Sequence, residues 1–212
     1  MIVLDGTLAL ANPEPGGVVR AEQGEAVFFR AGTWHHGFNV GAGSVRVRES
    51  FSPTPATGAS NEYADDHPPL PASEWTYTRP EVPRDWPMRA GEAPVEQTLY
   101  PVGKDEILWS MEGTRNPTMF PMFADTEQVR SGYIDLPPGQ HTDPHDHAGD
   151  EGVYVPTGTA YIHCPDERDE HWFELSAGDA CDRPAGVKHV YHNQSEQPVR
   201  LYFGLSPNPA PE

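Results

Sequence analysis

The chain of 212 residues is long enough for one large domain or two small ones, and its 36% hydrophobic content suffices for a packed core. Its formal net charge of −18 excludes the basic surface that nucleic acids require and argues equally against anionic membrane surfaces. It contains no run of about 18 apolar residues for a transmembrane helix, and its N-terminal segment lacks the basic region of a signal peptide. We therefore expect a cytoplasmic protein.

Strand-length runs of β-branched or alternating residues recur between glycines and prolines along the chain. They lie at residues 2–4, 26–29, 44–48, 132–136, 152–155, 159–163 and 199–204. No longer segment shows the 3.6-residue period of an amphipathic helix. The 20 glycines and 24 prolines fit turn-rich β structure better than a helical bundle. The predicted fold class is therefore all-β.

Residues 53–95 differ from the rest, because they are rich in Pro, Ala, Ser and acidic residues and hold few apolar positions. This composition predicts an ordered linker or crossover between two β units. Its prolines allow at most a short helix within residues 74–89. We expect Trp75, Tyr77 and Trp86 to fasten the segment onto a barrel surface; alternatively, one of them covers a pocket.

An internal repeat organises the chain. Val-Leu-Asp-Gly-Thr at residues 3–7 corresponds to Val-Pro-Thr-Gly-Thr at residues 155–159. The series Gly24, Gly32, His35 and Asn39 corresponds to Gly178, Gly186, His189 and Asn193. A loop between the two sets has changed by two residues. The repeat predicts a complete β unit at residues 96–212, preceded by the second half of a similar unit at residues 1–52.

Histidine and glutamate side chains with the spacing of metal ligands occur in the second copy. His145 and His147 lie two residues apart, so on a strand both point to one face. Glu151 follows with the same parity, and His189 can add a third imidazole from a neighbouring strand. Three imidazoles and one carboxylate suit Fe, Mn, Co, Ni, Cu or Zn, and they leave two positions open on an octahedral ion.

These residues resemble the two signature motifs of the cupin superfamily. The first motif, G-x5-H-x-H-x3-E-x6-G, is matched by Gly139, His145, His147, Glu151 and Gly158. The second, G-x5-P-x-G-x2-H-x3-N, is matched by Gly178, Pro184, Gly186, His189 and Asn193. The resemblance covers residues 96–212 directly and reaches residues 1–52 through the repeat. It implies a barrel of the double-stranded β-helix, or jelly-roll-like, kind.

The resemblance also implies one divalent transition metal ion in the mouth of this barrel, bound by His145, His147, Glu151 and His189. Fe or Mn is expected first, with Zn, Ni, Cu and Co as alternatives. The N-terminal copy keeps only the second motif, with Arg30 in place of the proline. The other ligand positions would fall before the first residue, so we expect no metal in that copy.

Two explanations of this incomplete copy stay open. In the first, the chain is a two-barrel cupin whose start has been placed too late, at an internal methionine. In the second, the chain is a one-and-a-half-barrel protein. In the second case the N-terminal strands pack on the complete barrel or on another subunit. A half barrel exposes strand edges, which predicts a homodimer or a larger homo-oligomer.

Strand residues beside the ion are expected to line a pocket for a small-molecule substrate. We select Trp109, Met119, Met122, Tyr133, Tyr161, His163, Tyr191 and Phe203, each of which would otherwise be ordinary barrel core. His141 and His163 would face the cavity as proton-transfer or supporting groups; otherwise they lie in solvent or in the core. An aromatic-lined cavity suits an aromatic or polyketide-like substrate better than a phosphosugar.

The resemblance leaves three functions open. The first is a metal-dependent oxidoreductase of the dioxygenase type, in which Glu151 can also act as a base. The second is a redox-neutral isomerase or cyclase that uses the ion as a Lewis acid. The third is a non-catalytic module that binds a small ligand. The two cysteines, Cys164 and Cys181, are too few for a disulfide framework, and we expect reduced thiols unless folding pairs them.

Overall fold

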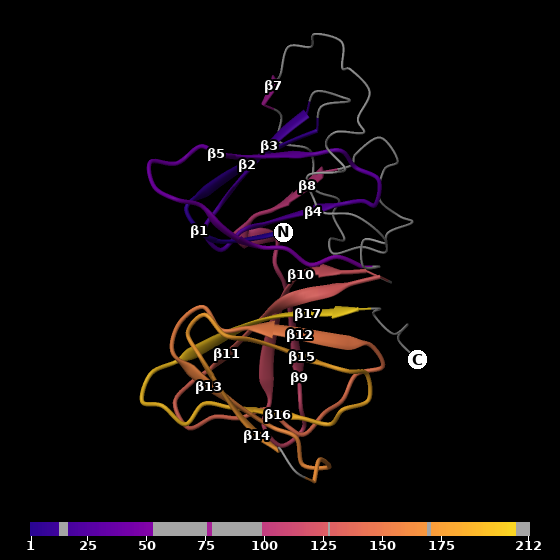
Figure 1. The fold of residues 1–212 in the computed structure, drawn as a ribbon, viewed down its shortest axis with the longest axis vertical. Helices are drawn as coiled ribbons and strands as arrows, with labels where there is room; N and C mark the ends of the chain where they lie inside the picture. The colour runs from indigo at the N-terminus through magenta and orange to yellow at the C-terminus, as the bar shows by residue number, and fades with distance from the viewer. Residues whose placement is uncertain (13–16, 53–75, 78–98, 127, 169–170, 207–212) are drawn as a thin grey trace. The chain divides into compact units, whose positions relative to one another are not determined.

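A computed structural model describes residues 1–12, 17–52, 76–77, 99–126, 128–168 and 171–206. The chain divides into two compact units, Met1–Ile107 and Leu108–Glu212, and each is described by itself (Figure 1). In the described residues, every element is a strand except one 3-10 turn at Lys104–Glu106. Each predicted run overlaps a strand, so the expectation of an all-β fold is confirmed.

The first unit contains eight strands among its described residues. These are β1 (Ile2–Asp5), β2 (Thr7–Asn12), β3 (Gly17–Glu22), β4 (Ala26–Phe29), β5 (His36–Asn39), β6 (Arg46–Arg48), β7 (Thr76–Tyr77) and β8 (Leu99–Val102). They form two sheets with the orders β6-β1-β4-β8 and β5-β2-β3-β7. Alternate side chains, among them Val3, Leu10 and Val27, pack into one buried cluster.

The second unit contains nine strands among its described residues. These are β9 (Leu108–Glu112), β10 (Thr118–Asp125), β11 (Arg130–Leu136), β12 (Asp150–Tyr154), β13 (Thr159–His163), β14 (Trp172–Ser176), β15 (Ala180–Arg183), β16 (Val190–His192) and β17 (Val199–Ser206). The sheet orders are β15-β12-β17-β11-β10-β9 and β14-β13-β16. Ile134 and Leu201 from one sheet and Ile162 from the other share a single buried core.

Strand order confirms the internal repeat. The order β4-β1-β6 in the first unit matches β15-β12-β17 in the second, and β3-β2-β5 matches β14-β13-β16. All of these pairs are antiparallel. In the described part of the first unit, β6 has no neighbour that corresponds to β11, which flanks β17 in the second. The first unit therefore repeats the second half of the barrel.

Equivalent turns of the two copies share backbone conformation and side-chain hydrogen bonds. Gly32 and Gly186 adopt φ angles of 76° and 77°, which L-residues with a Cβ rarely adopt. Asn39 and Asn193 each donate from Nδ2 to the carbonyl four residues on, at 2.6 and 2.7 Å. Each also accepts the amide two residues on at Oδ1. The turn that follows the site strand is thus held by asparagine in both units.

The two compact units meet in sequence between Ile107 and Leu108. Strand β8 pairs with β4 from Ala26↔Val102 to Phe29↔Leu99, which ties it to the first unit. The domain limits drawn from the sequence stay a prediction. The short helix considered within residues 74–89 lies outside the described residues, apart from β7, which pairs with β3. Trp75 and Trp86 also lie outside them.

Gly132 fills a position on β11 where no side chain fits. A Cβ there would overlap the backbone carbonyl oxygen of Pro121 and lie 3.0 Å from Met122 Cα and 3.1 Å from the Phe203 ring. We expect Gly132→Ala to lower the free energy of unfolding by roughly 3 kcal/mol, because backbone must move to admit the methyl group. Gly43→Ala is the matched control, since a Cβ there meets nothing within 4 Å. If Gly132→Ala and Gly43→Ala had equal denaturation midpoints, the predicted clash of a Cβ atom at position 132 would be contradicted.

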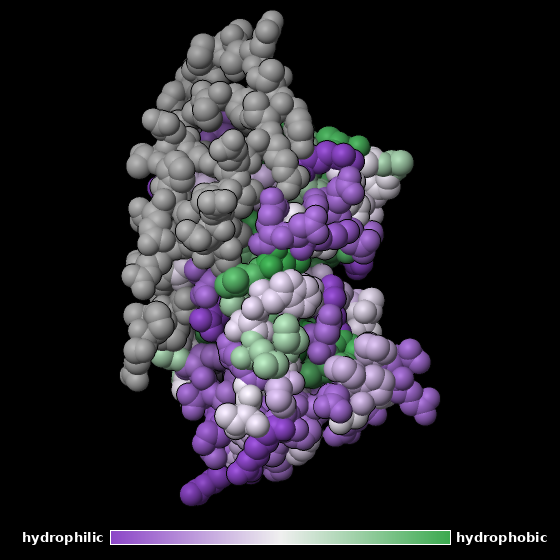
Figure 2. Space-filling view, turned by 180° about the vertical axis from the view of Figure 1, so that it is seen from behind, coloured by the Kyte–Doolittle hydropathy of each residue, from purple (hydrophilic) through white to green (hydrophobic). Residues whose placement is uncertain are grey.

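Hydrophilic side chains cover most of the described surface on the face shown in Figure 2, in keeping with the net charge of −18. Large hydrophobic side chains that are exposed include Phe38, Val40, Val47 and Phe51 in the first unit and Trp109, Met111, Met119 and Trp172 in the second. Among the described residues, no helix has the length and apolarity that a membrane crossing needs.

Candidate metal centre

Backbone pairing brings the two histidine motifs together in the second unit. His145 and His189 form an isolated antiparallel bridge, with His145 N donating to His189 O at 3.1 Å and His189 N donating to His145 O at 2.8 Å. His147 follows two residues after His145, and Glu151 lies in β12. Residues 44 positions apart in the sequence are therefore direct neighbours.

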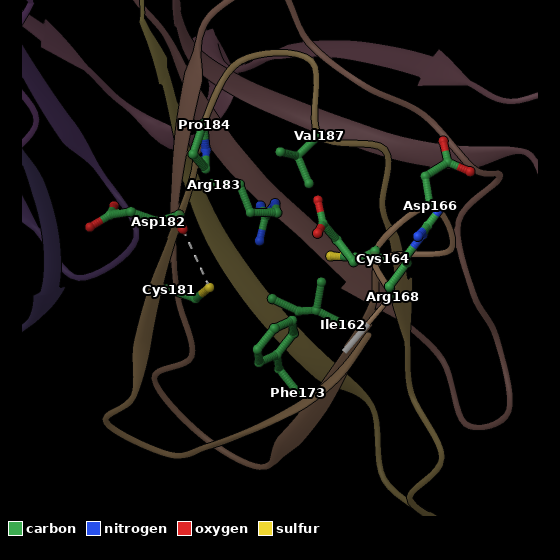
Figure 3. A pocket seen from close by; sticks show the side chains of 11 residues that line it. Ile162, Cys164, Asp166, Arg168, Phe173, Cys181, Asp182, Arg183, Pro184 and Val187 are labelled. Atoms are coloured by element: carbon green, nitrogen blue, oxygen red, sulfur yellow. Dashed lines mark hydrogen bonds between the residues drawn. The ribbon is translucent and has the colours of Figure 1, made fainter. Parts of the chain in front are cut away.

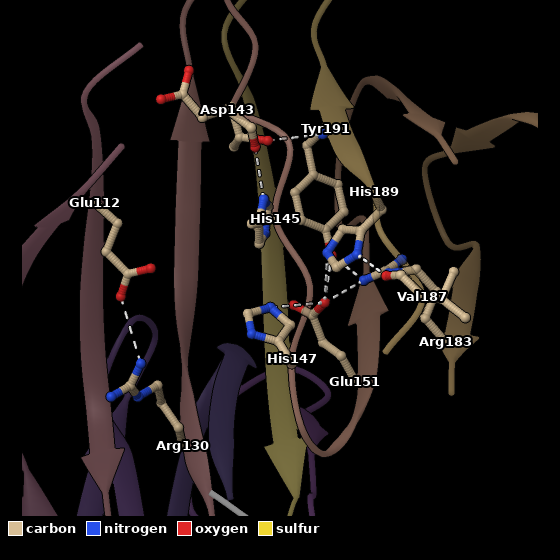
Figure 4. A network of polar contacts seen from close by, with 11 residues as sticks. Glu112, Arg130, Asp143, His145, His147, Glu151, Arg183, Val187, His189 and Tyr191 are labelled. Carbon is tan, nitrogen blue, oxygen red and sulfur yellow. Dashed lines mark hydrogen bonds and ion pairs between the residues drawn. The ribbon is translucent and has the colours of Figure 1, made fainter. Parts of the chain in front are cut away.

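The three imidazoles converge on one point (Figure 4). One ring nitrogen from each of His145, His147 and His189 lies within 4.8 Å of the other two. The ring centroids are 4.3 Å apart for His145 and His189, 5.1 Å for His145 and His147, and 5.5 Å for His147 and His189. The spacing fits three ligands of a single ion.

Backbone carbonyls fix which nitrogen of each ring is free. His145 Nδ1 lies 2.8 Å from Asp143 O, and His189 Nδ1 lies 2.9 Å from Val187 O. A carbonyl accepts a hydrogen bond, so Nδ1 of both rings carries a proton, and in neutral His145 the Nε2 atom then keeps its lone pair. The Nε2 atom of His145 is buried and has no hydrogen-bond partner among the described residues. A buried lone pair without a donor is what a metal ligand needs.

Glu151 lies beside two of the three imidazoles, those of His147 and His189. Its side chain is 4% exposed, and its Oε2 lies 3.1 Å from His189 Nε2 and 3.5 Å from His147 Nε2. Arg183 donates to the same oxygen at 2.6 Å, and the Tyr191 hydroxyl donates to it at 2.9 Å. Burial raises the pKa of Glu151, but the His189 contact and the Arg183 charge outweigh burial and hold this pKa well below its usual range. Glu151 is therefore an anion.

The same surroundings favour the neutral forms of His145 and His147. Burial lowers the pKa of His145, and the neighbouring His189 lowers it further. Burial is also the main cause of the lowered pKa of His147. Neutral imidazole and ionised carboxylate are the forms that bind metal ions. His145, His147 and Glu151 are thus in the protonation forms that bind a divalent transition metal.

Arg183 is a site residue that the sequence did not reveal. It faces Glu151 across the β12–β15 ladder, where the two residues are register partners. Its Nη2 also donates to the Tyr191 hydroxyl. The equivalent position in the first unit is Phe29, whose ring lies 4.4 Å from the ring of His35. The arginine therefore occurs in the copy that has Glu151 to pair with. Arg183 and Glu151 are far apart in the sequence, and the β12–β15 register brings them together.

Asp143 ties the β9–β10 hairpin to the site loop. Its carboxylate accepts the amides of Thr114 at 2.7 Å, Arg115 at 2.8 Å and Asn116 at 3.0 Å. Its backbone carbonyl orients His145. One residue therefore positions both the hairpin and a metal-motif imidazole.

Low pH should break this tether, the set of hydrogen bonds between the Asp143 carboxylate and the amides of the β9–β10 hairpin. The Arg115 amide, followed by those of Thr114 and Asn116, lowers the pKa of Asp143 from 3.8 to about 2. A lowered folded-state pKa means that the carboxylate stabilises the fold above its ordinary pKa and loses this effect as the pH falls through about 2. We expect Asp143→Asn to speed amide exchange at Thr114 and Arg115 several-fold at pH 6, with the difference from wild type shrinking towards pH 2. An unchanged exchange rate at pH 6 would contradict the tether.

The structure brings only part of the expected pocket set to the site. Met122, Tyr191 and Phe203 lie in the inner core cluster, and Tyr191 contacts Glu151. Trp109 and Met119 are 58% and 42% exposed.

Tyr133, Tyr161 and His163 lie on outer sheet faces. Tyr133 alternates with core residue Ile134 and packs on Tyr202, with ring centroids 5.9 Å apart. Tyr161 and His163 flank core residue Ile162, so they point away from the core. Apolar and aromatic residues stand on both faces of these strands, which is why residue type alone did not separate the faces.

A cavity of about 700 Å³ lies beside Arg183 (Figure 3). Ile162, Phe173 and Val187 form apolar parts of its wall, and its lining includes both Cys164 and Cys181. Both cysteines are free thiols, Cys164 buried and Cys181 partly buried. None of the residues selected from the sequence lines this cavity. Arg183 belongs both to the cavity wall and to the contacts of Glu151.

Residues 132–204 match the model of the cupin domain family. The second unit is a cupin domain. This match confirms the resemblance found in the sequence. No protein of curated function matches the chain significantly.

Solved structures similar to the chain include two bacterial proteins. A Klebsiella pneumoniae protein with a double-stranded β-helix domain is 21% identical, with a TM-score of 0.41, over 47% of this chain and 85% of its own. A cupin domain from Bordetella pertussis is 25% identical, with a TM-score of 0.37, over 45% of this chain and 97% of its own. At these scores, the assignment of the cupin domain rests on the family match and the strand pairing.

Proposed function

We propose that the cupin domain binds one divalent transition metal ion through His145, His147, Glu151 and His189. The observation that carries the proposal is the convergence of three imidazole nitrogens within 4.8 Å beside a buried, ionised carboxylate. Imidazole-rich sites with one carboxylate suit Fe, Mn, Co, Ni, Cu and Zn. Bound there, such an ion would supply Lewis acidity or redox chemistry to a substrate beside it.

We further propose that the domain is a dioxygenase-type oxidoreductase acting on a small, largely apolar organic substrate, with Fe or Mn as its metal. The cavity supports this substrate class, since about 700 Å³ lies in the range of small-molecule sites. Ile162, Phe173 and Val187 on its wall suit an aromatic or polyketide-like body, whereas Asp166, Glu167, Arg168 and Asp182 suit polar groups on that body. Arg183, on the wall of the cavity, suits an acidic hydroxyl or carboxyl group on that body.

The chain's own residues would orient the substrate and hold a proton. Glu151 is a buried acceptor, and the Tyr191 hydroxyl already donates to it. Arg183 keeps this carboxylate ionised, while burial, followed by the charge of Glu151, raises the pKa of Tyr191 well above its usual value. Tyr191 therefore stays protonated and Glu151 stays ionised, so Glu151 would accept a substrate proton only after its contact with Arg183 is broken.

Oxygen consumption tests this function. The protein, loaded separately with Fe²⁺, Mn²⁺ and Zn²⁺, would be offered a panel of catechols, flavonols and β-diketones. Oxygen uptake with Fe or Mn, lost in His145→Ala, is the expected result. The matched control is His36→Ala, which changes an exposed histidine of the first unit. No uptake with any member of the panel would reject the dioxygenase proposal.

A redox-neutral isomerase or cyclase is the second candidate. It is favoured by the buried Tyr191–Glu151 pair, a proton donor and a proton acceptor in direct contact. Equal turnover with Zn²⁺ and without oxygen would select it. Tight ligand binding without turnover, unchanged by metal removal, would instead indicate a binding module.

Self-association remains a proposal. It is supported by the apolar side chains exposed in the first unit, among them Phe38 and Phe51, and by the edge of β6 that has no strand partner among the described residues. Light scattering across micromolar concentrations tests it, and a single monomeric species would reject it.

A further inference from the structure

A second group of histidines lies on the outer face of the β14-β13-β16 sheet. Core residue Ile162 points inward from β13, so its neighbour His163 points outward. On β16, core residue Tyr191 is likewise followed by outward-facing His192. His141 forms an antiparallel bridge with His192 and lies on the same face. All three imidazoles are partly buried, on the side of the sheet away from the candidate metal centre.

The spacing of these rings resembles that of the metal centre. The ring centroids of His141 and His192 are 5.0 Å apart, and those of His163 and His192 are 6.2 Å apart. The corresponding separations in the metal centre run from 4.3 to 5.5 Å. Directly opposed cross-strand residues have Cβ atoms about 5 Å apart, which lets two imidazoles reach one ion.

Lone pairs are available on two of these rings. His141 Nδ1 lies 2.9 Å from Thr142 O, so Nδ1 carries the proton and Nε2 is free to bind, as in the metal centre. His192 Nε2 is buried and has no hydrogen-bond partner among the described residues. Burial, followed by the neighbouring His141 and His163, lowers the pKa of His192, which favours the neutral, metal-binding form.

The internal repeat shows that the sheet does not need these histidines. The position of His192 is occupied by Phe38 in the first unit, and that of His163 by Ala11. Both copies form the same three-stranded sheet. The strand pairing therefore gives no reason for imidazoles at these places.

We propose that His141, His163 and His192 form a second site for a divalent transition metal, of the imidazole-binding class that includes Zn²⁺, Ni²⁺ and Cu²⁺. His141 and His192 provide the cross-strand pair, and His163 is the third ligand. Among the described residues, only the first centre already holds three ligand atoms within 4.8 Å. His163, which stacks on Trp172 at 4.4 Å, must therefore rotate towards the pair.

The test counts metal equivalents with Ni²⁺ by titration calorimetry and elemental analysis. The wild type is expected to bind a second equivalent beyond the first centre, and His145→Ala/His189→Ala is expected to keep it. His163→Ala/His192→Phe installs the residues that the first unit tolerates at these positions, and it should weaken this second equivalent by at least about tenfold. His36→Ala is the matched control, and thermal melting confirms that each variant folds.

Trp172 provides a local readout, because its ring lies 4.4 Å from that of His163 and 4.9 Å from that of His192. Cu²⁺ at this site should quench the tryptophan fluorescence, and Trp172→Phe should remove the quenched component without removing the metal. Absence of the second equivalent in the wild type, or its retention at full affinity in folded His163→Ala/His192→Phe, would overturn the proposal.

Discussion

Arg183→Met should lower the free energy of unfolding of the metal-free protein by roughly 3–5 kcal/mol, because it leaves the Glu151 carboxylate buried without its cation. The two side chains are each 4% exposed and 2.6 Å apart. A bound metal would replace the lost charge, so the loss should shrink on metal loading. Chemical denaturation with and without metal measures both values.

The controls separate charge from packing. In Arg183→Met/Glu151→Gln no unpaired charge remains, so most of the stability should return. Arg200→Met breaks another pair, 2.6 Å from Asp135, but those side chains are 37% and 49% exposed, and the expected loss is below about 1 kcal/mol. Equal losses from Arg183→Met and Arg200→Met would contradict the role given to Arg183.

His189→Ala should abolish the stabilisation that metal gives to the fold. A ligand at about a thousand times its dissociation constant stabilises a protein by about 4 kcal/mol. His189 is 1% exposed and close to both His145 and Glu151, so its removal takes a central ligand from the group. We expect its removal to weaken binding at this site by more than about a hundredfold, and the metal-induced rise in melting temperature should largely vanish.

The control for this measurement is His35→Ala, which removes the equivalent histidine of the incomplete first unit. His35 Nδ1 lies 2.9 Å from Thr33 O, the same local arrangement as His189. Since the sequence places no other ligand of that motif in the first unit, metal should stabilise this variant as it does the wild type. Loss of metal stabilisation in His35→Ala would contradict the assignment of the site to the cupin domain.

The cupin fold and the convergence of the histidines were predictable, because both depend on local patterns. His145 and His147 were expected to share the face of a strand, but His145 forms only an isolated bridge with His189 and His147 lies in no strand. The glycines of the second motif fix the turn before His189. The repeat could be found for the same reason, since Gly32 and Gly186 mark turns with nearly identical φ angles.

The surroundings of the site were not predictable, because they depend on register and on the choice of sheet face. Arg183 meets Glu151 only through the pairing of β12 with β15. Tyr161 and His163 were expected beside the ion, but their strand alternates with Ala160 and Ile162, which take the inner face. In the sequence Thr-Ala-Tyr-Ile-His-Cys the apolar set Ala160, Ile162 and Cys164 alternates with a set of polar or amphipathic residues, so alternation favours the inner face that the structure shows. Tyr161 and His163 were selected for their chemistry and not for their place in this alternation.

Elemental analysis of the purified protein beside folded His145→Ala tests the central claim most directly. The proposed ligand set predicts one equivalent of a divalent transition metal in the wild type that the variant loses, because His145 Nε2 is a buried lone pair with no other partner among the described residues. Metal content that is equal in the two proteins, or no uptake by the wild type after reconstitution, would contradict the metal centre.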